Sequence, residues 1–166
     1  LKKYHVPAAF FVTKGFVQDQ PELVKRMKEE GHVVGDHTMS HPSLAACSVD
    51  EIIQEVDGLA DYMKEQTGYE IDPFIRPPKG EYSERSLKVC QDLGYTSVFW
   101  SMAYLDYDVN NQPGKDHVVE MFQKYHHPGM ITLTHNVSSS NAEALPEVLE
   151  NLSKEGYRFG SLWDLR

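Results

Sequence analysis

The chain has 166 residues, of which 40% are hydrophobic and 25% charged, and its net charge at pH 7 is -9. This length fits one domain that is large enough to bury a hydrophobic core. The negative net charge argues against a nucleic-acid binder that works through a basic face. No apolar run reaches the length of a membrane span. The two cysteines are too few to define a disulfide framework, so we expect both to be free.

Strand and helix patterns alternate in the first half of the chain. In order, we expect the tail of a helix at 1–4, a strand at 6–13, a helix at 21–31, a strand at 32–35 and a long helix at 48–68. The unbroken apolar run at 6–13 is typical of a strand buried on both faces of a parallel sheet. Ser48 and Glu51 have the spacing of a capping box, which marks the start of the long helix.

The alternation continues in the second half. We expect a strand at 74–75, a helix at 83–94, a strand at 96–100, a helix around 118–122, a strand at 130–134, a last helix up to Gly156 and a strand at 157–159. Asn141 is the candidate cap of the last helix. Strands that alternate with helices predict a parallel α/β fold, either a barrel or an open sheet.

His37 and His41 are the first candidate site residues, because they directly follow the predicted strand at 32–35. Two side chains four residues apart lie on one face when they share a helical turn. Both imidazoles then reach one metal ion, for which imidazole is a common ligand. Pro42 disfavours helical geometry at His41, so we expect the turn to stop there. The spacing is a loose pattern, and two unrelated surface histidines are the alternative.

The other candidate residues share a position relative to the predicted strands. The histidine pair follows one strand and Arg76 follows a second. Asp106 follows a third strand and His135 a fourth. In parallel α/β folds the site lies at the carboxyl ends of the strands, so we expect an active site built from these residues. Taken singly, Arg76 also fits a surface cation, Asp106 a loop cap and His135 a core histidine. We interpret the remaining histidines as surface, loop or edge residues.

Four short motifs occur in a definite order along the chain. They are His37–Pro42 (HTMSHP), Arg76–Gly80 (RPPKG), the stretch from Trp100 through Asp106 to Tyr107, and Leu133–His135 (LTH). In residues, order and spacing they resemble four of the five motifs of the polysaccharide deacetylases of the NodB-homology type, carbohydrate esterase family 4. The likeness runs from the first residue to the last.

The resemblance implies hydrolysis of N-acetyl groups on the amino sugars of a cell-wall polysaccharide. It implies His37 and His41 as metal ligands, with Zn²⁺ or another divalent ion such as Co²⁺, Ni²⁺ or Mn²⁺ as cofactor. Such an ion polarises a carbonyl and lowers the pKa of bound water. The resemblance also implies His135 as the general acid, Asp106 as the carboxylate that orients it, and Arg76 as the partner of the catalytic base.

The same resemblance implies Pro77, Gly80, Leu133 and Tyr107 as substrate-binding residues, and we add Lys79 because of its charge. Leu133 stands two residues before His135, on the same face of the predicted strand, and would line the pocket for the acetyl methyl group. Tyr107 stands where the family often has Trp. A basic residue at Lys79 is typical of the branch that acts on N-acetylmuramic acid of spore-cortex peptidoglycan. We expect Lys79 to contact a carboxylate of that substrate.

The family's first motif, a Thr-Phe-Asp-Asp-Gly strand, is missing from this sequence. Its first Asp is the family's catalytic base and its second Asp is the third metal ligand. Asp36 adjoins His37 but stands where the family has Asn or Asp, so we assign it no role. We therefore expect residues 1–166 to be an N-terminally incomplete NodB-homology domain, a distorted parallel (β/α) barrel that lacks its first strand.

Several functions stay open at this point. The first is a deacetylase of peptidoglycan N-acetylmuramic acid, and the second is a deacetylase of N-acetylglucosamine or chitin-type polymers. A non-catalytic glycan-binding remnant of the same fold is the third, and another α/β metallohydrolase, such as a phosphoesterase, is the fourth. The expected partner is a glycan rather than a nucleic acid. Because such polymers lie outside the membrane, the family implies an extracytoplasmic location.

Overall fold

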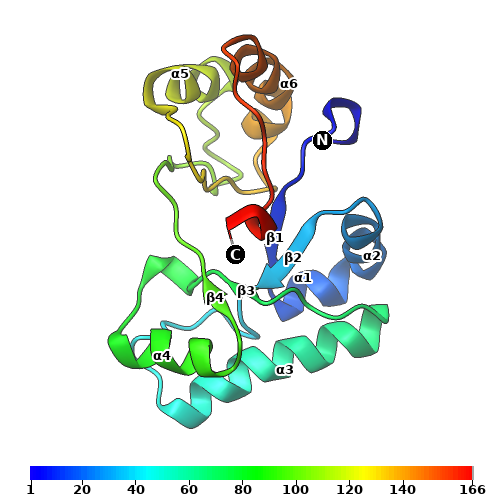
Figure 1. Cartoon of the computed structure of the whole chain (residues 1–166), viewed down its shortest axis with the longest axis vertical. Helices are drawn as coiled ribbons and strands as arrows, with labels where there is room; N and C mark the ends of the chain where they lie inside the picture. The colour runs from blue at the N-terminus through cyan, green and yellow to red at the C-terminus, as the bar shows by residue number, and fades with distance from the viewer. Residues whose placement is uncertain (166) are drawn as a thin grey trace. The chain divides into compact units, whose positions relative to one another are not determined.

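The computed structural model describes residues 1–165 (Figure 1). The chain divides into two compact units. Leu1–Phe99 forms the first unit together with the segment that begins at Gly160, and Trp100–Phe159 forms the second. Each unit has a hydrophobic core of its own. No helix among the described residues is long and apolar enough to cross a membrane.

The first unit alternates strands and helices. In chain order its elements are η1 (Lys2–Tyr4), β1 (Ala9–Val12), α1 (Lys14–Asp19), α2 (Pro21–Glu29), β2 (Val33–Asp36), α3 (Val49–Thr67), β3 (Phe74–Ile75), η2 (Pro78–Gly80), α4 (Glu84–Asp92), β4 (Thr96–Ser97) and η3 (Leu162–Leu165), where η denotes a 3-10 helix. The strands form one parallel sheet in the order β1-β2-β3-β4. The predicted parallel α/β class is therefore confirmed.

The long helix α3 contributes to both hydrophobic clusters of this unit. One cluster joins it to β1, β2, α1 and α2 and consists of Val12, Val17, Val24, Met27, Val34, Leu59 and Met63. The other joins it to β3 and α4 and consists of Leu44, Ile52, Val56, Ile75 and Cys90. All four residues of β2 are buried, as expected for a strand with neighbours on both sides and helices packed on the sheet.

Local capping signals placed two helices of this unit correctly. Ser48 and Glu51 form the predicted capping box at the start of α3, and Gly68 ends that helix with a left-handed backbone. Ser83 caps α4 as well. Helix α1 was not predicted, although Thr13 caps it by accepting a hydrogen bond from the backbone of Phe16. A threonine cap before an apolar pair was the signal that could have revealed it.

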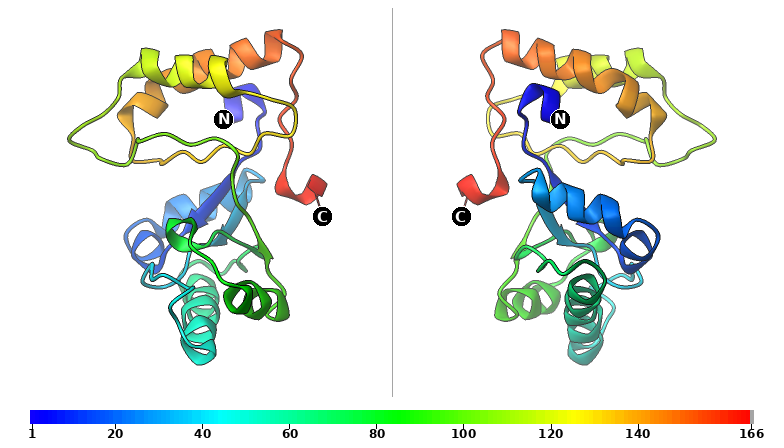
Figure 2. Two further views of the ribbon diagram at one scale, coloured as in Figure 1. Left: turned by 90° about the vertical axis from the view of Figure 1, so that its left-hand side faces the viewer. Right: turned by 90° about the vertical axis from the view of Figure 1, so that its right-hand side faces the viewer.

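The second unit is built on two helices, α5 (Lys115–Tyr125) and α6 (Ser139–Lys154), which pack side by side (Figure 2). Its core contains Met102, Val118, Val119, Phe122, Ala144, Val148 and Leu152. The predicted helix around 118–122 is confirmed as α5. The cap of α6 is Ser138 rather than Asn141, which lies in the first turn and donates its backbone N–H to the Ser138 hydroxyl at 3.1 Å.

Two strand predictions in the second unit are wrong. The segment 130–134 forms only an isolated parallel bridge, between Thr132 and Met102, and 157–159 is irregular. The strand predicted at 96–100 is shortened to β4. An apolar run becomes a strand only where a neighbouring segment pairs with it along its length, and that pairing is not visible in the run itself.

Candidate active site

His37 and His41 lie in the loop that follows β2, in the first unit. The loop is not the helical turn predicted from their spacing, because Thr38 and His41 have left-handed backbones with φ of 70° and 60°. Asp36 Oδ1 accepts a hydrogen bond from the Thr38 backbone at 2.7 Å, and Thr38 Oγ1 accepts one from the His41 backbone at 3.0 Å. The folded loop brings the two imidazole centroids to 4.7 Å, with the rings at 79°.

Helix α3 holds this loop through Glu55. The Ser40 backbone N–H donates to Glu55 Oε2 at 2.8 Å, and the Ser40 hydroxyl donates to Glu55 Oε1 at 2.6 Å. The Met39 backbone also donates to the Glu55 carbonyl at 3.1 Å. Three hydrogen bonds accepted by this single helical residue therefore fix the segment between the two histidines.

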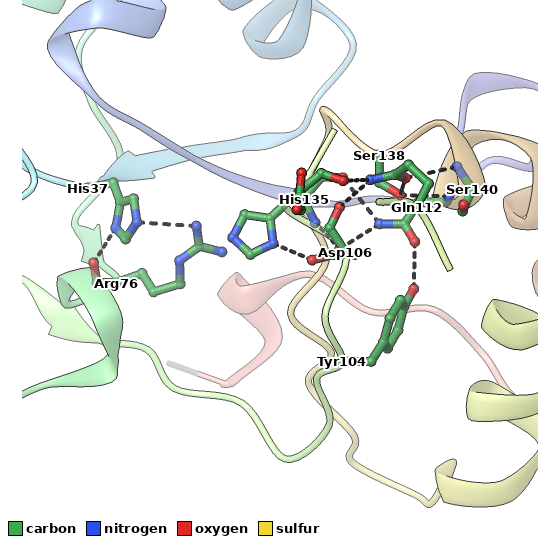
Figure 3. Close-up of polar contacts among 10 residues, drawn as sticks. His37, Arg76, Tyr104, Asp106, Gln112, His135, Ser138 and Ser140 are labelled. Atoms are coloured by element: carbon green, nitrogen blue, oxygen red, sulfur yellow. Dashed lines mark hydrogen bonds and ion pairs between the residues drawn. The ribbon is translucent and has the colours of Figure 1, made fainter. Parts of the chain in front are cut away.

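His37 and Arg76 contact each other through both imidazole nitrogens (Figure 3). The Nδ1–H of His37 donates to the Arg76 carbonyl at 2.6 Å, which places the ring proton on Nδ1. Nε2 then accepts from Arg76 Nη2 at 3.4 Å. The Arg76 guanidinium also lies over the Phe11 ring, 5.1 Å from its centroid. Arg76 is thus a partner of the histidine loop rather than a solvated surface cation.

The histidine pair fits two ligands of a divalent metal site. An Nδ1–H that donates to a carbonyl is the arrangement that orients metal-binding imidazoles, and His37 has it. Among residues 1–165, no group of three or more His, Cys, Asp or Glu side chains is placed to hold a metal ion. The described residues therefore contain the two histidines of the predicted site, and no third side chain of these types is grouped with them.

Asp36 is the one buried side chain of the described residues that has an oxygen without a hydrogen-bond partner, Oδ2. Burial raises the pKa of Asp36 to about 8; the hydrogen bond from Thr38 opposes this, and the charges of Glu55 and Asp57 add to it. Burial thus favours the protonated form of Asp36. It was assigned no role from the sequence, whereas the structure shows that its Oδ1 anchors the turn at Thr38.

Pro77, Lys79 and Gly80 lie in and beside the turn η2, which directly follows Arg76. Pro77 is buried, and the Gly80 backbone donates to its carbonyl at 3.1 Å. Lys79 and Gly80 both have left-handed backbones, with φ of 61° and 70°. The turn leaves the Lys79 side chain exposed. The roles of these three residues in substrate binding stay predictions.

Asp106 and His135 form a hydrogen-bonded pair in the second unit (Figure 3). Asp106 Oδ1 accepts from the Nδ1–H of His135 at 2.6 Å, and Oδ2 accepts from the backbone N–H of His135, also at 2.6 Å. A parallel bridge joins Met102 to Thr132, so the two segments run in the same direction. Asp106 and His135 therefore both lie beyond the carboxyl end of the bridge. The Asp106 side chain is 1% exposed, whereas that of His135 is 35% exposed.

The Asp106 carboxylate is held in its ionised form. Burial by itself raises the pKa of Asp106, but hydrogen bonds from His135 and Asn141 outweigh burial, and the pKa lies below its ordinary value. A buried carboxylate behind a partly exposed imidazole is the arrangement of an oriented general acid or base. The structure thus shows Asp106 paired with His135, and its catalytic role stays a prediction.

Sequence reasoning missed the polar residues that surround this pair. Gln112 donates from Nε2 to the carbonyls of Asp106 and Asp108, at 2.9 and 2.8 Å, and its Oε1 accepts from the Ser138 hydroxyl at 2.6 Å. Asn141 donates to Asp106 Oδ2 at 2.7 Å. These residues belong to a polar loop and a helix start, and no fixed spacing in the sequence links them to Asp106.

Two predicted substrate residues also lie in the second unit. The exposed Tyr107 ring meets the His135 ring edge-on, with centroids 5.8 Å apart. Leu133 was placed on one strand face with His135, but that segment forms only an isolated bridge, between Thr132 and Met102, and not a strand. The structure therefore groups Asp106, His135 and Tyr107 in this unit, and a contact of Leu133 with substrate stays a prediction.

Comparisons with known proteins agree with the motifs. The family model described as polysaccharide deacetylase matches residues 1–98. The chain is 46% identical over 165 residues to PdaA of Bacillus subtilis, a peptidoglycan-N-acetylmuramic acid deacetylase. The match covers 99% of this chain and 63% of that protein. The chain is 31% identical to a peptidoglycan-N-acetylglucosamine deacetylase of Bacillus cereus, and that match covers 98% of this chain and 59% of the relative. The chain thus spans about three fifths of the lengths of these two relatives.

Solved structures show the same backbone. Bacillus subtilis PdaA, a family 4 carbohydrate esterase, matches with a TM-score of 0.94 at 46% identity, covering 99% of this chain and 70% of PdaA. BA3943 of Bacillus anthracis, described as a pseudoenzyme of the same family, matches with a TM-score of 0.90 at 27% identity, covering 99% of this chain and 57% of that one. The similarity therefore extends over nearly the whole chain in both sequence and fold.

Proposed function

The chain belongs to the polysaccharide deacetylase family, and we propose from this that it serves the hydrolysis of N-acetyl groups on the amino sugars of peptidoglycan. The observation that carries the proposal is the Asp106–His135 pair. The amine that leaves an amide must be protonated, because an amide anion is too basic to depart. A partly exposed imidazole that is oriented by a buried carboxylate meets that need.

In the proposed mechanism His135 delivers its proton from Nε2. Its Nδ1–H is already donated to Asp106, so Nε2 is the nitrogen that remains to deliver the proton. When the proton leaves, the neutral ring keeps its Nδ1–H bond to Asp106 and therefore its orientation. A positioned acid of this kind contributes about 10²- to 10⁴-fold in rate. The Tyr107 ring supports one edge of the imidazole.

We further propose His37 and His41 as ligands of a divalent metal ion, with Zn²⁺ as the first candidate and Co²⁺, Ni²⁺ and Mn²⁺ as alternatives. Such an ion, when bound, polarises the amide carbonyl and lowers the pKa of water. The orientation of His37 by the Arg76 carbonyl supports this role. The Arg76 guanidinium would hold a neighbouring carboxylate ionised, which is the role that the family implies for it.

For the substrate we propose N-acetylmuramic acid, the sugar named for the 46% identical relative, over N-acetylglucosamine, which is named for the 31% identical one. Lys79 supports this choice. Its exposed ammonium group suits a carboxylate, and the lactyl or peptide part of a muramic-acid substrate supplies one. Because peptidoglycan lies outside the membrane, the proposed site of action is extracytoplasmic.

The experiment that tests this function measures acetate release from N-acetylated peptidoglycan with added Zn²⁺. Residues 1–166 are compared with a version extended through the natural upstream sequence. We expect acetate release, and we expect His37→Ala and His135→Ala to abolish it. His5→Ala is the control, because His5 belongs neither to the histidine pair nor to the Asp106–His135 pair, and it should keep the activity. Mass spectrometry of the products identifies the deacetylated sugar. Lys79→Ala should reduce turnover of muramic acid, and an unchanged rate would remove Lys79 from the substrate site.

A non-catalytic glycan-binding protein is the second candidate function. The match to the Bacillus anthracis pseudoenzyme supports it, because that protein has the same fold at a TM-score of 0.90. The acetate assay separates the two candidates. Absence of release by both versions of the chain, together with retained binding to peptidoglycan in a pull-down assay, would favour the binding protein.

A further inference from the structure

The side-chain amide of Asn141 joins both members of the Asp106–His135 pair. Asn141 is the third residue of α6. Its Nδ2 donates to Asp106 Oδ2 at 2.7 Å and to the backbone carbonyl of His135 at 3.1 Å. The two N–H bonds of the amide thus each have an acceptor in the pair. The imidazole binds the other carboxylate oxygen, Oδ1, so Asn141 supports Asp106 without competing with His135 Nδ1.

Tyr104 fixes which end of this amide faces Asp106. Its hydroxyl donates to Asn141 Oδ1 at 2.7 Å. With the amide turned over, an oxygen would face the Asp106 carboxylate, and Tyr104 would meet an N–H. Burial raises the pKa of the Tyr104 hydroxyl well above its ordinary value, and the charge of Asp106 adds to the effect. The hydroxyl therefore keeps the proton that it donates.

The start of α6 fixes the backbone of Asn141 as well. Its N–H donates to the hydroxyl of Ser138, the cap of the helix, at 3.1 Å. The Ser138 hydroxyl in turn donates to Gln112 Oε1 at 2.6 Å. Because the residue is held at both its backbone and its amide oxygen, little freedom is left to Nδ2. Pre-organisation of this kind keeps a reacting group within reach of its working geometry.

We propose that Asn141 is a positioning residue for the general acid: its amide, oriented by Tyr104, holds the Asp106 carboxylate against Nδ1 of His135. The inference rests on the proposed function only for its effect on turnover, because the hydrogen-bond network exists independently of any substrate. Without Nδ2, the buried Oδ2 loses one of its two donors, and the carboxylate can rotate away from the imidazole.

The first test observes the hydrogen bond itself. The proton on His135 Nδ1 should give a low-field NMR resonance, identified by its loss in Asp106→Ala. Asn141→Leu keeps the approximate shape of the side chain and removes its donor. We expect solvent exchange of that proton to accelerate at least about tenfold, so that the signal broadens. Asn151→Leu, further along α6 and outside the network, should leave it unchanged. An unaltered signal in Asn141→Leu would overturn the proposal.

A milder variant keeps the test decisive if Asn141→Leu does not fold. Tyr104→Phe removes one hydroxyl and leaves the amide in place. We expect it to accelerate exchange of the His135 proton by a smaller factor, because the amide then loses only its orienting donor. Tyr125→Phe, an exposed tyrosine on α5, is the matched control. Equal signals in Tyr104→Phe and Tyr125→Phe would contradict the orienting role.

The second test uses turnover in the version of the protein that proves active. Asn141→Leu should lower kcat about 10- to 100-fold with little change in KM. In an Asp106→Ala background the same substitution should have almost no further effect, because Asn141 acts through Asp106. Equal losses in both backgrounds would show a merely structural role and overturn the proposal. If no version releases acetate, the proposed function fails, while the NMR test still decides the role of Asn141.

Discussion

Glu55 holds Ser40 through both of its carboxylate oxygens, at 2.8 Å to the backbone N–H and 2.6 Å to the hydroxyl. Ser40 lies between the two histidines of the candidate metal loop. Thr38 and His41 in that loop have left-handed backbones, which cost free energy outside glycine. The two bonds that Glu55 accepts therefore help to hold the loop that brings the imidazole rings together. Glu55 therefore supports the proposed metal ligands, and the spacing of His37 and His41 along the chain did not indicate this role.

Replacing Glu55 should weaken metal binding. We expect Glu55→Ala to reduce Co²⁺ affinity about 10- to 100-fold, the usual cost of losing a residue that supports metal ligands. Glu55→Gln should lose less, because an amide still accepts from the Ser40 backbone and donates to its hydroxyl. Isothermal titration calorimetry measures the affinities, with the exposed Glu65→Ala on the same helix as control. If Glu55→Ala binds Co²⁺ as tightly as the parent chain, Glu55 does not support the metal ligands.

Gly35 and Gly15 should respond to alanine in opposite directions. A Cβ on Gly35, in β2, would lie 2.7 Å from the Phe74 carbonyl oxygen and 2.7 Å from the Phe11 ring. We expect Gly35→Ala to lower the free energy of unfolding by about 1–3 kcal/mol or more. A Cβ on Gly15, in α1, meets nothing within 4 Å. Gly15→Ala should raise stability by up to about 1 kcal/mol. Urea denaturation measures both, and unchanged or raised stability in Gly35→Ala would refute the close approach in β2.

Asp106 should make stability depend on acid. Its pKa in the folded protein is lowered from the ordinary value of about 3.9. The contribution of Asp106 to the free energy of unfolding is therefore complete above that pH. It is lost as the pH falls through the folded-state pKa, because the unfolded chain takes up the proton first. Asp106→Asn should flatten the decline of the melting temperature between about pH 5 and pH 2. Circular dichroism melts test this, with the exposed Asp116→Asn as control, and parallel profiles would contradict the prediction.

Gln112 should contribute to the stability of the second unit. Gln112→Ala removes the partner of the Asp106 and Asp108 carbonyls and of the Ser138 hydroxyl. We expect the free energy of unfolding to fall by about 1–2 kcal/mol, because the Asp106 carbonyl loses the N–H that Gln112 donates and the Ser138 hydroxyl loses its acceptor. Gln123→Ala, on the exposed side of α5, should change it by less than about 0.5 kcal/mol. Similar losses in the two variants would show that the hydrogen bonds of Gln112 are replaced by water.

Local signals explain which parts of the fold were predictable. The capping box at Ser48, the stop at Gly68 and the apolar run that contains β1 depend on residues close together in the chain, and all were predicted correctly. The segment 130–134 was predicted as a strand and is only a bridge, because ladder pairing depends on a distant partner. Helical spacing likewise suggested a helical turn for His37 and His41, and the left-handed loop overrides it.

The sequence by itself determined the α/β class and the family and indicated the candidate site residues, because motifs and capping signals depend on short stretches of chain. The tertiary structure decided how those residues are held. Only folding places Glu55 against Ser40, the Arg76 carbonyl against His37, and Asn141 between Asp106 and His135. Each of these contacts joins separate elements, and a hydrogen bond depends on distance and direction in space, neither of which any spacing along the chain specifies.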